Sequence, residues 1–415
     1  MKSRFGVLAF LFVLANLTYI DRICLSLAAL PIQQEMGLTP DQWGWVLGAF
    51  ALSYALFEIP SGAMGDRIGP RRVLTRIVLW WSAFTALTPA TRSFLPLCLV
   101  RFLFGAGEAG AFPNSTATIA RWFPGPERGR AQAFVFFGSR IGGALSPFLV
   151  IPLQQAFGWR ATFLVFGSAG AVWAIAWYAW FHDSPADVSA QQPGSSVAPA
   201  RAVTRLDWSG TLRQPRVWIL FAMYHTYSWS GFFFQGWMYT YLAKARGYDL
   251  QDLLRLSWVP FLMAAVGSML GGATSDALVK RLGLRWGRRL VGLIGLGASA
   301  GFLVASYFAT GKISSIVLFG LAYASSDFML PVAWAVCLDI GGEHVGAVSG
   351  MMNTAGQLGS FLTSIVFGYV VAAWGSYDLP LLGLAVIAAG SALLWLWIDP
   401  LTPVATKPCH LEPVS

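Results

Sequence analysis

Long apolar stretches separated by short polar loops dominate the sequence. A helix needs about 20 apolar residues to cross the hydrocarbon core of a bilayer. Six such stretches lie in the first half, at residues 5–30, 42–62, 73–90, 95–120, 130–152 and 160–181. Six more follow, at residues 216–242, 255–278, 289–309, 313–337, 345–372 and 379–398. The pattern predicts an all-α membrane protein with twelve transmembrane helices, because barrel strands would alternate over segments of about ten residues.

A polar segment divides these stretches into two groups of six. It is rich in Ser, Pro, Gln and Ala and carries Arg201, Arg205 and Arg213, a composition typical of a linker. The predicted organisation is a six-helix bundle at 1–182, a cytoplasmic linker at 183–215, a second six-helix bundle at 216–400 and a cytoplasmic tail at 401–415.

One motif recurs at the same place in each half. The sequence GAMGDR at residues 62–67 follows the second stretch, and GGATSD at residues 271–276 follows the eighth. Each is succeeded by basic residues, Arg71 and Arg72 in the first case and Arg281, Arg288 and Arg289 in the second. The echo predicts two parallel repeats that form two pseudo-symmetric bundles.

Composition and charge agree with a membrane protein. Charged residues make up 11% of the chain, against about 25% in an average soluble domain. The net charge of +9 comes from basic residues in alternate loops, which the positive-inside rule places in the cytoplasm. We therefore expect a multi-pass protein of a bacterial-type inner (plasma) membrane with both termini cytoplasmic, surrounded by lipid and without a nucleic-acid partner.

The first copy of the motif resembles the signature G-x-x-x-D-R-x-G-x-[RK]-[RK] of the major facilitator superfamily. Its glycines let two helix ends approach, and an aspartate there is suited to latch a helix N-terminus or an arginine. A purely structural turn is the alternative. The resemblance implies the major facilitator fold and gating roles for Asp66, Arg67, Arg71 and Asp276.

A narrower resemblance covers nearly the whole chain. The segments NLTYIDR (16–22), RFLFGAGEA (101–109), FPN (112–114) and GMMNTAGQ (350–357) are similar to the anion:cation symporter family. That family includes bacterial carriers of galactonate, glucarate and hexuronates and resembles sialin and the vesicular glutamate transporters. The resemblance implies proton-coupled import of carboxylates, with substrate contacts at Tyr19, Arg22, Tyr54 and Arg101 and protonation at Asp21 and Glu108. Glu58 and Asp327 depart from the family pattern.

Seven charged residues fall inside predicted membrane helices. A charge at the bilayer centre costs roughly 2.5 to 3.5 kcal/mol on insertion scales, so each needs a partner, a wet cavity or a function. Arginine suits an anion site because its planar fork binds a carboxylate bidentately and keeps its charge. The seven are Asp21, Arg22, Glu58, Arg101, Glu108, Arg140 and Asp327.

Helical spacing predicts which of these charges share a face. Arg101 and Glu108 are seven residues apart, so they lie on one face but about 10.5 Å apart along the axis. We expect both to line one cavity without a direct ion pair. Tyr19 lies three residues before Arg22, which places a phenol beside a guanidinium, as a carboxylate with hydroxyls would require.

Structural roles are the alternatives at these positions. Arg22 and Arg101 could instead form a salt bridge between the first and fourth helices, with Asp21 or Glu108. Glu108 could be an ion-pair partner that never titrates. Arg140 is either a third cationic contact to substrate or a partner of Glu58, which we also count among the proton-coupling carboxyls.

The second half offers uncharged donors and aromatic faces to a substrate. Trp334, Asn353 and Gln357 are the predicted contacts, and Tyr224, Tyr227 and Gln235 offer further donors and faces. Packing is the alternative for the aromatic residues among them, since aromatics at helical spacing more often pack. His225 is expected to be a satisfied core histidine.

The predicted function is uptake of a small organic anion with protons, by alternating access of a monomer. A sugar acid such as galactonate, glucarate or a hexuronate is the first expectation. Import of an aromatic or dicarboxylic acid is an alternative, and proton-coupled efflux is a further one. An enzyme is disfavoured, since the four scattered histidines form no metal or nucleophile constellation. A transporter-like sensor is disfavoured because such proteins usually carry a signalling domain, whereas 15 residues follow Pro400. No catalytic residue, metal or cofactor other than the coupling proton is expected.

Overall fold

The computed structural model describes residues 4–123, 125–183, 205–341 and 344–407. Within these ranges a few side chains, including those of Asp66 and Arg67, are not described. Most of the predicted linker, at residues 184–204, and the last part of the predicted tail, at residues 408–415, therefore lie outside the described residues.

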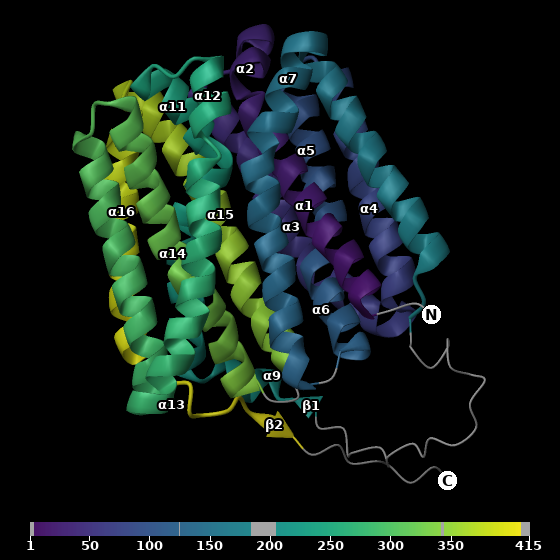
Figure 1. The fold of residues 1–415 in the computed structure, drawn as a ribbon, viewed down its shortest axis with the longest axis vertical. Coiled ribbons are helices and arrows are strands. Elements are labelled where there is room, and N and C mark those ends of the chain that lie inside the picture. The colour runs from purple at the N-terminus through teal and green to yellow at the C-terminus, as the bar shows by residue number, and fades with distance from the viewer. Residues whose placement is uncertain (1–3, 124, 184–204, 342–343, 408–415) are drawn as a thin grey trace.

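Helices of the first half form an upright bundle (Figure 1). These helices coincide with the apolar stretches of the sequence, and their observed bounds lie close to the predicted ones. The helices are α1 (Arg4–Leu27), α2 (Ala29–Met36), α3 (Pro40–Ile68), α4 (Pro70–Leu87) with the short η1 (Thr88–Ala90), α5 (Phe94–Glu108), α6 (Ala111–Trp122) and α7 (Gly125–Trp180).

The second half forms a similar bundle beside the first (Figure 1). Its helices are α9 (Trp208–Leu212), α10 (Pro215–Phe232), the π-helical η2 (Phe233–Trp237), α11 (Met238–Arg246), α12 (Leu250–Leu256), α13 (Val259–Phe308), α14 (Lys312–Gly341), α15 (Val345–Trp374), α16 (Leu379–Leu394) and η4 (Trp395–Trp397).

Two glycines divide the longest helices. Gly158 in α7 has φ 77° and ψ 166°, and Gly283 in α13 has φ 77° and ψ 167°, a conformation open mainly to glycine. Gly69, between α3 and α4, is similar with φ 90° and ψ 147°. In the described chain, eight helical segments are long and apolar enough to cross a membrane, and two of them contain these bends. Counting each bent segment twice and adding α3 and α10–η2–α11 gives the twelve predicted segments.

The two ends of the bundle differ. We call the end that carries α9 and the strands β1 (Arg205–Leu206) and β2 (Thr406–Lys407) the linker end, and the end that carries α2 and α12 the distal end (Figure 1). At the linker end β1 and β2 pair antiparallel, and the Val404 amide donates to the Ile340 carbonyl at 2.9 Å. The described part of the tail is thereby tied to α14 and to the segment before α9.

The halves meet closely at the distal end. A Cβ on Gly44 of α3 would lie 2.5 Å from the Ser364 carbonyl oxygen of α15, so only glycine lets these backbones approach this far. The Trp237 indole donates to the same carbonyl at 3.3 Å. A second contact between the halves is made by Gly143 of α7, which packs against the Phe261 ring of α13. The distal end is therefore closed by contacts between the halves.

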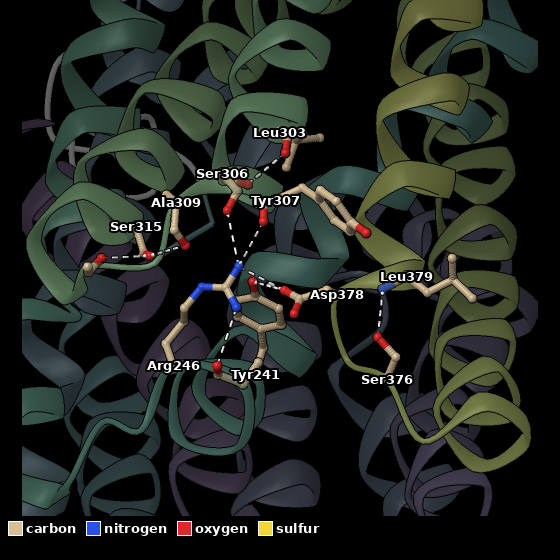
Figure 2. A network of polar contacts seen from close by, with 12 residues as sticks. Tyr241, Arg246, Leu303, Ser306, Tyr307, Ala309, Ser315, Ser376, Asp378 and Leu379 are labelled. Atoms are coloured by element: carbon tan, nitrogen blue, oxygen red, sulfur yellow. Dashed lines mark hydrogen bonds and ion pairs between the residues drawn. The ribbon is translucent and has the colours of Figure 1, made fainter.

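An arginine fastens the distal end of the second half internally (Figure 2). Arg246, at the end of α11, forms an ion pair of 2.8 Å with Asp378 and donates to the carbonyls of Ser306 and Tyr307 at 3.2 and 3.4 Å. The Tyr241 hydroxyl donates to the same Asp378 oxygen at 2.6 Å. This network joins α11, the end of α13 and the loop before α16.

Candidate functional site

A cavity of about 640 Å³ lies between the two halves. It reaches from the middle of α1 to Asp276 and Arg288 of α13, near the linker end, where the Asp276 side chain is 75% exposed. The cavity therefore extends toward the linker end, while the distal end is closed. Of the predicted site residues, those in its wall are Tyr19, Arg22, Tyr54, Arg140, Asp276, Trp334, Asn353 and Gln357.

Arg22 is placed in the wall by α1 and is held by aromatic rings and one carboxylate. Its Nε donates to Glu108 Oε1 at 2.7 Å, and its Nη2 lies 2.5 Å from the same oxygen. Its guanidinium lies 5.5, 5.0 and 5.1 Å from the ring centroids of Tyr19, Phe50 and Tyr54. Such rings favour a cation over a neutral group. The predicted alternative of an ion pair between the first and fourth helices is present in this geometry.

The helix that carries Glu108 ends directly after it. The predicted fourth stretch is broken into α5 and α6, because Gly110 adopts φ 89°. Asn114 of α6 donates to the carbonyls of Gly110 and Ser61, at 2.7 and 3.2 Å. The break fixes Glu108 at a helix terminus, with its Oε2 lacking a hydrogen-bond partner among the described residues.

Arg101 and Glu108 are not in the cavity wall, so the expectation that both line it is wrong. Arg101 is instead packed between the rings of Phe50 and Phe104, at 5.2 and 4.3 Å. Its Nε has no hydrogen-bond partner among the described residues. Asp21 is buried close enough to Arg101 and Glu108 to interact with both charges. The spacing of seven residues places Arg101 and Glu108 on one face of the helix. The rings of Phe50 in α3 and Phe104 in α5 nevertheless cover Arg101 and keep it out of the cavity wall.

Arg140 pairs with Asp327 across the two halves. Its Nε donates to Asp327 Oδ2 at 2.5 Å and its Nη2 to Oδ1 at 3.0 Å, a bidentate contact from α7 to α14. Nη1 donates to the Tyr19 hydroxyl at 2.8 Å, and the Tyr227 hydroxyl donates to Asp327 Oδ1 at 3.1 Å. The expected alternative of an Arg140–Glu58 pair is therefore wrong.

Glu58 forms a different contact between the halves. Asn353 Nδ2 of α15 donates to Glu58 Oε1 of α3 at 2.5 Å, and Glu58 Oε2 has no hydrogen-bond partner among the described residues. Asn353 therefore reaches a carboxylate from the first half as well as the cavity. The sequence singled out both residues, but not their pairing.

The other polar residues of the second half are arranged around the cavity. Trp334 Nε1 donates to the Tyr224 hydroxyl at 3.2 Å, and Gln235 and Gln357 both line the wall. The His225 ring is bonded to the Ala355 carbonyl at 2.9 Å and to the Trp229 indole at 3.4 Å. His225 is thus the satisfied histidine that the sequence predicts.

The predicted gating residues lie at the linker end. Arg71 donates from its guanidinium to the Tyr178 carbonyl at 2.7 and 2.9 Å, and its amide donates to Asp183 at 2.8 Å. It therefore joins α4 to the end of α7 within the first half. The side chains of Asp66 and Arg67 lie outside the described part of the chain.

In the second half, Arg288 rather than Asp276 is the centre of the charge network. Arg288 donates to Asp339 at 3.1 Å and to Ser275 at 2.9 Å, and lies 3.7 Å from Asp276. Sequence reasoning missed Asp339, whose only signal is an acidic residue at the end of an apolar stretch. Among the described residues, no group of three or more His, Cys, Asp or Glu is placed to hold a metal ion.

Comparison with known proteins identifies the family. The model of the Major Facilitator Superfamily matches residues 11–361. A protein of Cupriavidus necator named a probable sulfoacetate transporter is 36% identical, covering 97% of this chain and 96% of that protein. A probable L-galactonate transporter of Escherichia coli is 28% identical over 94% of this chain and 87% of its own. The hexuronate transporter of Bacillus subtilis is 28% identical over 100% of this chain and 99% of its own.

The fold is also found in a solved structure. A bacterial homolog of the human lysosomal transporter Spinster, in an inward-facing and unoccupied conformation, superposes with a TM-score of 0.78 and 18% identity, covering 96% of this chain and 97% of that one. At this identity the likeness concerns the fold alone. With a matching family model over most of its length and relatives named as anion transporters, the chain belongs to the major facilitator superfamily and is a transporter rather than an enzyme.

Proposed function

We propose that this transporter imports a small organic anion together with protons, across a bacterial inner membrane and by alternating access. A sugar acid such as galactonate, glucarate or a hexuronate is the first candidate substrate. The single observation that carries the proposal is the Arg22 guanidinium, which lines the cavity among three aromatic rings. Relatives named as galactonate and hexuronate transporters support the choice of substrate.

The anion site is built from a fixed cation and neutral donors. Arginine keeps its proton when desolvated, so Arg22 stays positive in the cavity. A substrate carboxylate would compete with Glu108 for the Arg22 fork, as the two anions use the same donors. Trp334, Asn353 and Gln357 lie in the wall of the second half, where the amides of Asn353 and Gln357 can bind substrate hydroxyls and the Trp334 ring can pack against the substrate.

The balance of buried charge favours proton coupling. Around the closed end of the cavity the described residues place three guanidiniums, on Arg22, Arg101 and Arg140, and four carboxyls, on Asp21, Glu58, Glu108 and Asp327. Adding an anionic substrate would enlarge the negative excess in a medium of low dielectric constant. Proton binding at Glu108, Asp21 and Glu58 offsets that excess, so anion and proton bind more favourably together than apart.

Alternating access then follows from the two ends. The positive-inside rule places the linker end in the cytoplasm, which makes the described conformation open inward. Opening of the distal contacts between α3 and α15, with closure of the linker end, would expose the same cavity to the outside. Substrate and proton would enter there and leave on the cytoplasmic side.

Sulfoacetate is the second candidate substrate. It is favoured by the relative at 36% identity, which bears that name and is matched over nearly its full length. Sulfoacetate and sugar acids share a carboxylate, but sulfoacetate is smaller and carries a sulfonate as its second charged group. Transport assays with a panel of both kinds of anion therefore distinguish the two candidates.

Transport into proteoliposomes tests the proposal. The purified protein should accumulate one of galactonate, glucarate, glucuronate or sulfoacetate when the outside is more acidic, and a protonophore should abolish accumulation. Glu108→Gln should retain exchange of internal for external substrate but lose accumulation. Uptake that does not depend on the pH gradient would contradict the proposed proton coupling. If the protein neither transports nor binds any of these anions, the proposal of an anionic substrate is wrong.

A further inference from the structure

We propose that Arg22 and Arg140 form two anion subsites for one substrate that carries two negative groups. In this arrangement Asp327 is a built-in carboxylate that the second negative group displaces from Arg140. The inference rests on the proposed function and deepens it, because it names the charge class of the substrate and selects glucarate or sulfoacetate over galactonate and the hexuronates, which carry one negative group. It also gives specific roles to Arg140 and Asp327, which the proposed function counts only in the balance of buried charge.

The two guanidiniums share one wall of one cavity. Both lie within 5.5 Å of the ring centroid of Tyr19, Arg22 at 5.5 Å and Arg140 at 5.3 Å, and all three residues line the cavity. Arg140 Nη1 also donates to the Tyr19 hydroxyl oxygen at 2.8 Å. The ring thus lies beside both cations, and all three line one space, which suits a short molecule with two anionic groups.

The Arg140–Asp327 contact has the geometry of bound substrate carboxylate. Two nitrogens of Arg140 meet the two oxygens of Asp327 in a bidentate fork, the arrangement that arginine makes with any carboxylate. A Tyr227 hydroxyl completes the set of donors at 3.1 Å. Carboxylates and sulfonates of a substrate offer the same acceptor oxygens, so either can replace Asp327 on these donors.

Displacement leaves Asp327 as a buried carboxylate that has lost its cation. The side chain is fully buried, and an unpaired charge in such a place is strongly unfavourable. The charged and titratable groups that face it are Arg140 of α7, Tyr19 of α1, Tyr227 of α10 and Tyr323 of α14. None of the three phenols supplies a positive charge. The displaced carboxylate therefore takes up a proton, and each dianion that reaches Arg140 binds together with one proton.

The exchange also alters the contact between the halves. Asp327 belongs to α14 and Arg140 to α7, so their ion pair joins the second half directly to the first. The two negative groups of a substrate bound to Arg22 and Arg140 are both held by the first half, through α1 and α7, whereas the Arg140–Asp327 ion pair joins the halves. Occupancy thus weakens one link between the halves, and this is the change that alternating access requires.

Binding of matched anions to purified protein tests the inference. The probes are sulfoacetate against acetate and methanesulfonate, and D-glucarate against D-gluconate, so that each dianion is compared with molecules that carry only one of its charges. The variants are Asp327→Asn, which frees Arg140, and the double variant Arg140→Gln with Asp327→Asn, which removes the subsite without leaving a buried charge.

A matched control exists at the distal end. Asp378 also accepts from one arginine, Arg246, and from one tyrosine, Tyr241, but none of the three lines the cavity. Asp378→Asn therefore removes a similar ion pair without touching the proposed subsites. It should leave the relative affinities of dianion and monoanion unchanged.

The expected results concern the ratio of dianion to monoanion affinity. Asp327→Asn should raise dianion affinity at neutral pH by about tenfold, which is about 1.4 kcal/mol, and should flatten its dependence on pH. The double variant should lose the preference for dianions over the matched monoanions. If Asp327→Asn fails to fold, the ratio of dianion to monoanion affinity in the double variant is sufficient to test the inference.

Two outcomes would overturn the inference while leaving the proposed function intact. One is a wild type that binds monoanions at least as tightly as the matched dianions. The other is a double variant that keeps the dianion preference of the wild type. If the wild-type protein binds neither monoanions nor dianions, the proposed function itself is wrong, and this inference loses its basis.

Discussion

Asn353 Nδ2 lies 2.5 Å from Glu58 Oε1 and thereby joins α15 to α3 across the two halves. Glu58 is 1% exposed, and its other oxygen has no hydrogen-bond partner among the described residues. An amide bonds to a carboxyl in either protonation state, whereas an arginine would fix the charge. Glu58 is thus a carboxyl in this cluster that can gain a proton without breaking an ion pair.

Replacement of Glu58 by Gln should make transport less dependent on external pH. Glutamine keeps the length and an acceptor oxygen for Asn353 but cannot titrate, so the change in uptake between pH 5 and pH 8 should become smaller, while Glu108 and Asp21 still bind protons. Initial uptake rates over this range provide the measurement. Glu127→Gln is the control, because Glu127 pairs with Arg4 outside the cavity. An unchanged pH profile in Glu58→Gln would assign Glu58 a structural role.

Conservative replacement of the cavity arginine should weaken anion binding. Arg22→Lys keeps the charge but loses the planar fork and its contacts with three rings. We expect a loss of about 2 kcal/mol or more, roughly thirtyfold in Kd. Isothermal calorimetry with the transported anion measures the change. Arg4→Lys, at an exposed ion pair, should bind like the wild type, and equal affinities for both variants would contradict the assignment.

A larger residue at Gly44 should hold the distal end open. The Cβ of Gly44→Val would meet the Ser364 carbonyl at 2.5 Å, so α3 and α15 could not approach as they do here. A cysteine introduced at Phe361, which packs near Gly48 in this interface, should then react faster with a membrane-impermeant thiol reagent. Gly297→Val is the control, because no atom lies within 4 Å of its Cβ position. Equal labelling in both backgrounds would exclude this effect.

Acidification should loosen the contact between α2 and the distal turn of α7. Glu35 accepts from Arg160 at 2.5 Å and from the Trp159 indole at 2.9 Å, and these donors lower the pKa of Glu35 below its ordinary value of 4.5. A lowered pKa in the folded protein means that the contribution is present above pH 4.5 and is lost as pH falls through the folded-state value.

The melting temperature of Glu35→Gln, measured at several pH values, tests whether the stabilising contribution of Glu35 is lost on acidification. The variant should melt below the wild type at pH 7, and the difference should shrink as the pH is lowered beneath 4.5. A difference that grows on acidification would mean that the pair does not act through the ionised carboxylate. Because Glu35 is exposed, the effect at pH 7 should be small and should fall with salt.

The sequence predicts the fold well because the bilayer imposes one length on every span. The last apolar stretch, predicted at 379–398, is α16 and η4, which run to Trp397. The stretches at 130–152 and 160–181 are the two arms of α7 on either side of Gly158. The break at Gly110 is not predicted, since one glycine among 44 carries no mark of its backbone conformation.

The candidate site is predicted in its members but not in its pairs. Spacing along one helix places Tyr19 and Arg22 correctly on a common face. Arg140 and Asp327 are 187 residues apart, so their contact depends on how the two halves are placed together. The same holds for Glu58 and Asn353. Burial of Arg101 beneath aromatic rings likewise depends on the packing of α3 against α5, which periodicity within α5 does not define.

Gly69 and Gly283 follow corresponding copies of the repeated motif and adopt similar backbone angles, yet their tolerance to mutation should differ. At Gly283 a Cβ would meet nothing within 4 Å, so a substitution there carries only the backbone strain of a positive φ. At Gly69 it would also lie 2.6 Å from the Asp183 carboxylate, which accepts the Arg71 amide. Substitution is therefore less restricted at the second position, so the two copies of the turn are under different structural constraints.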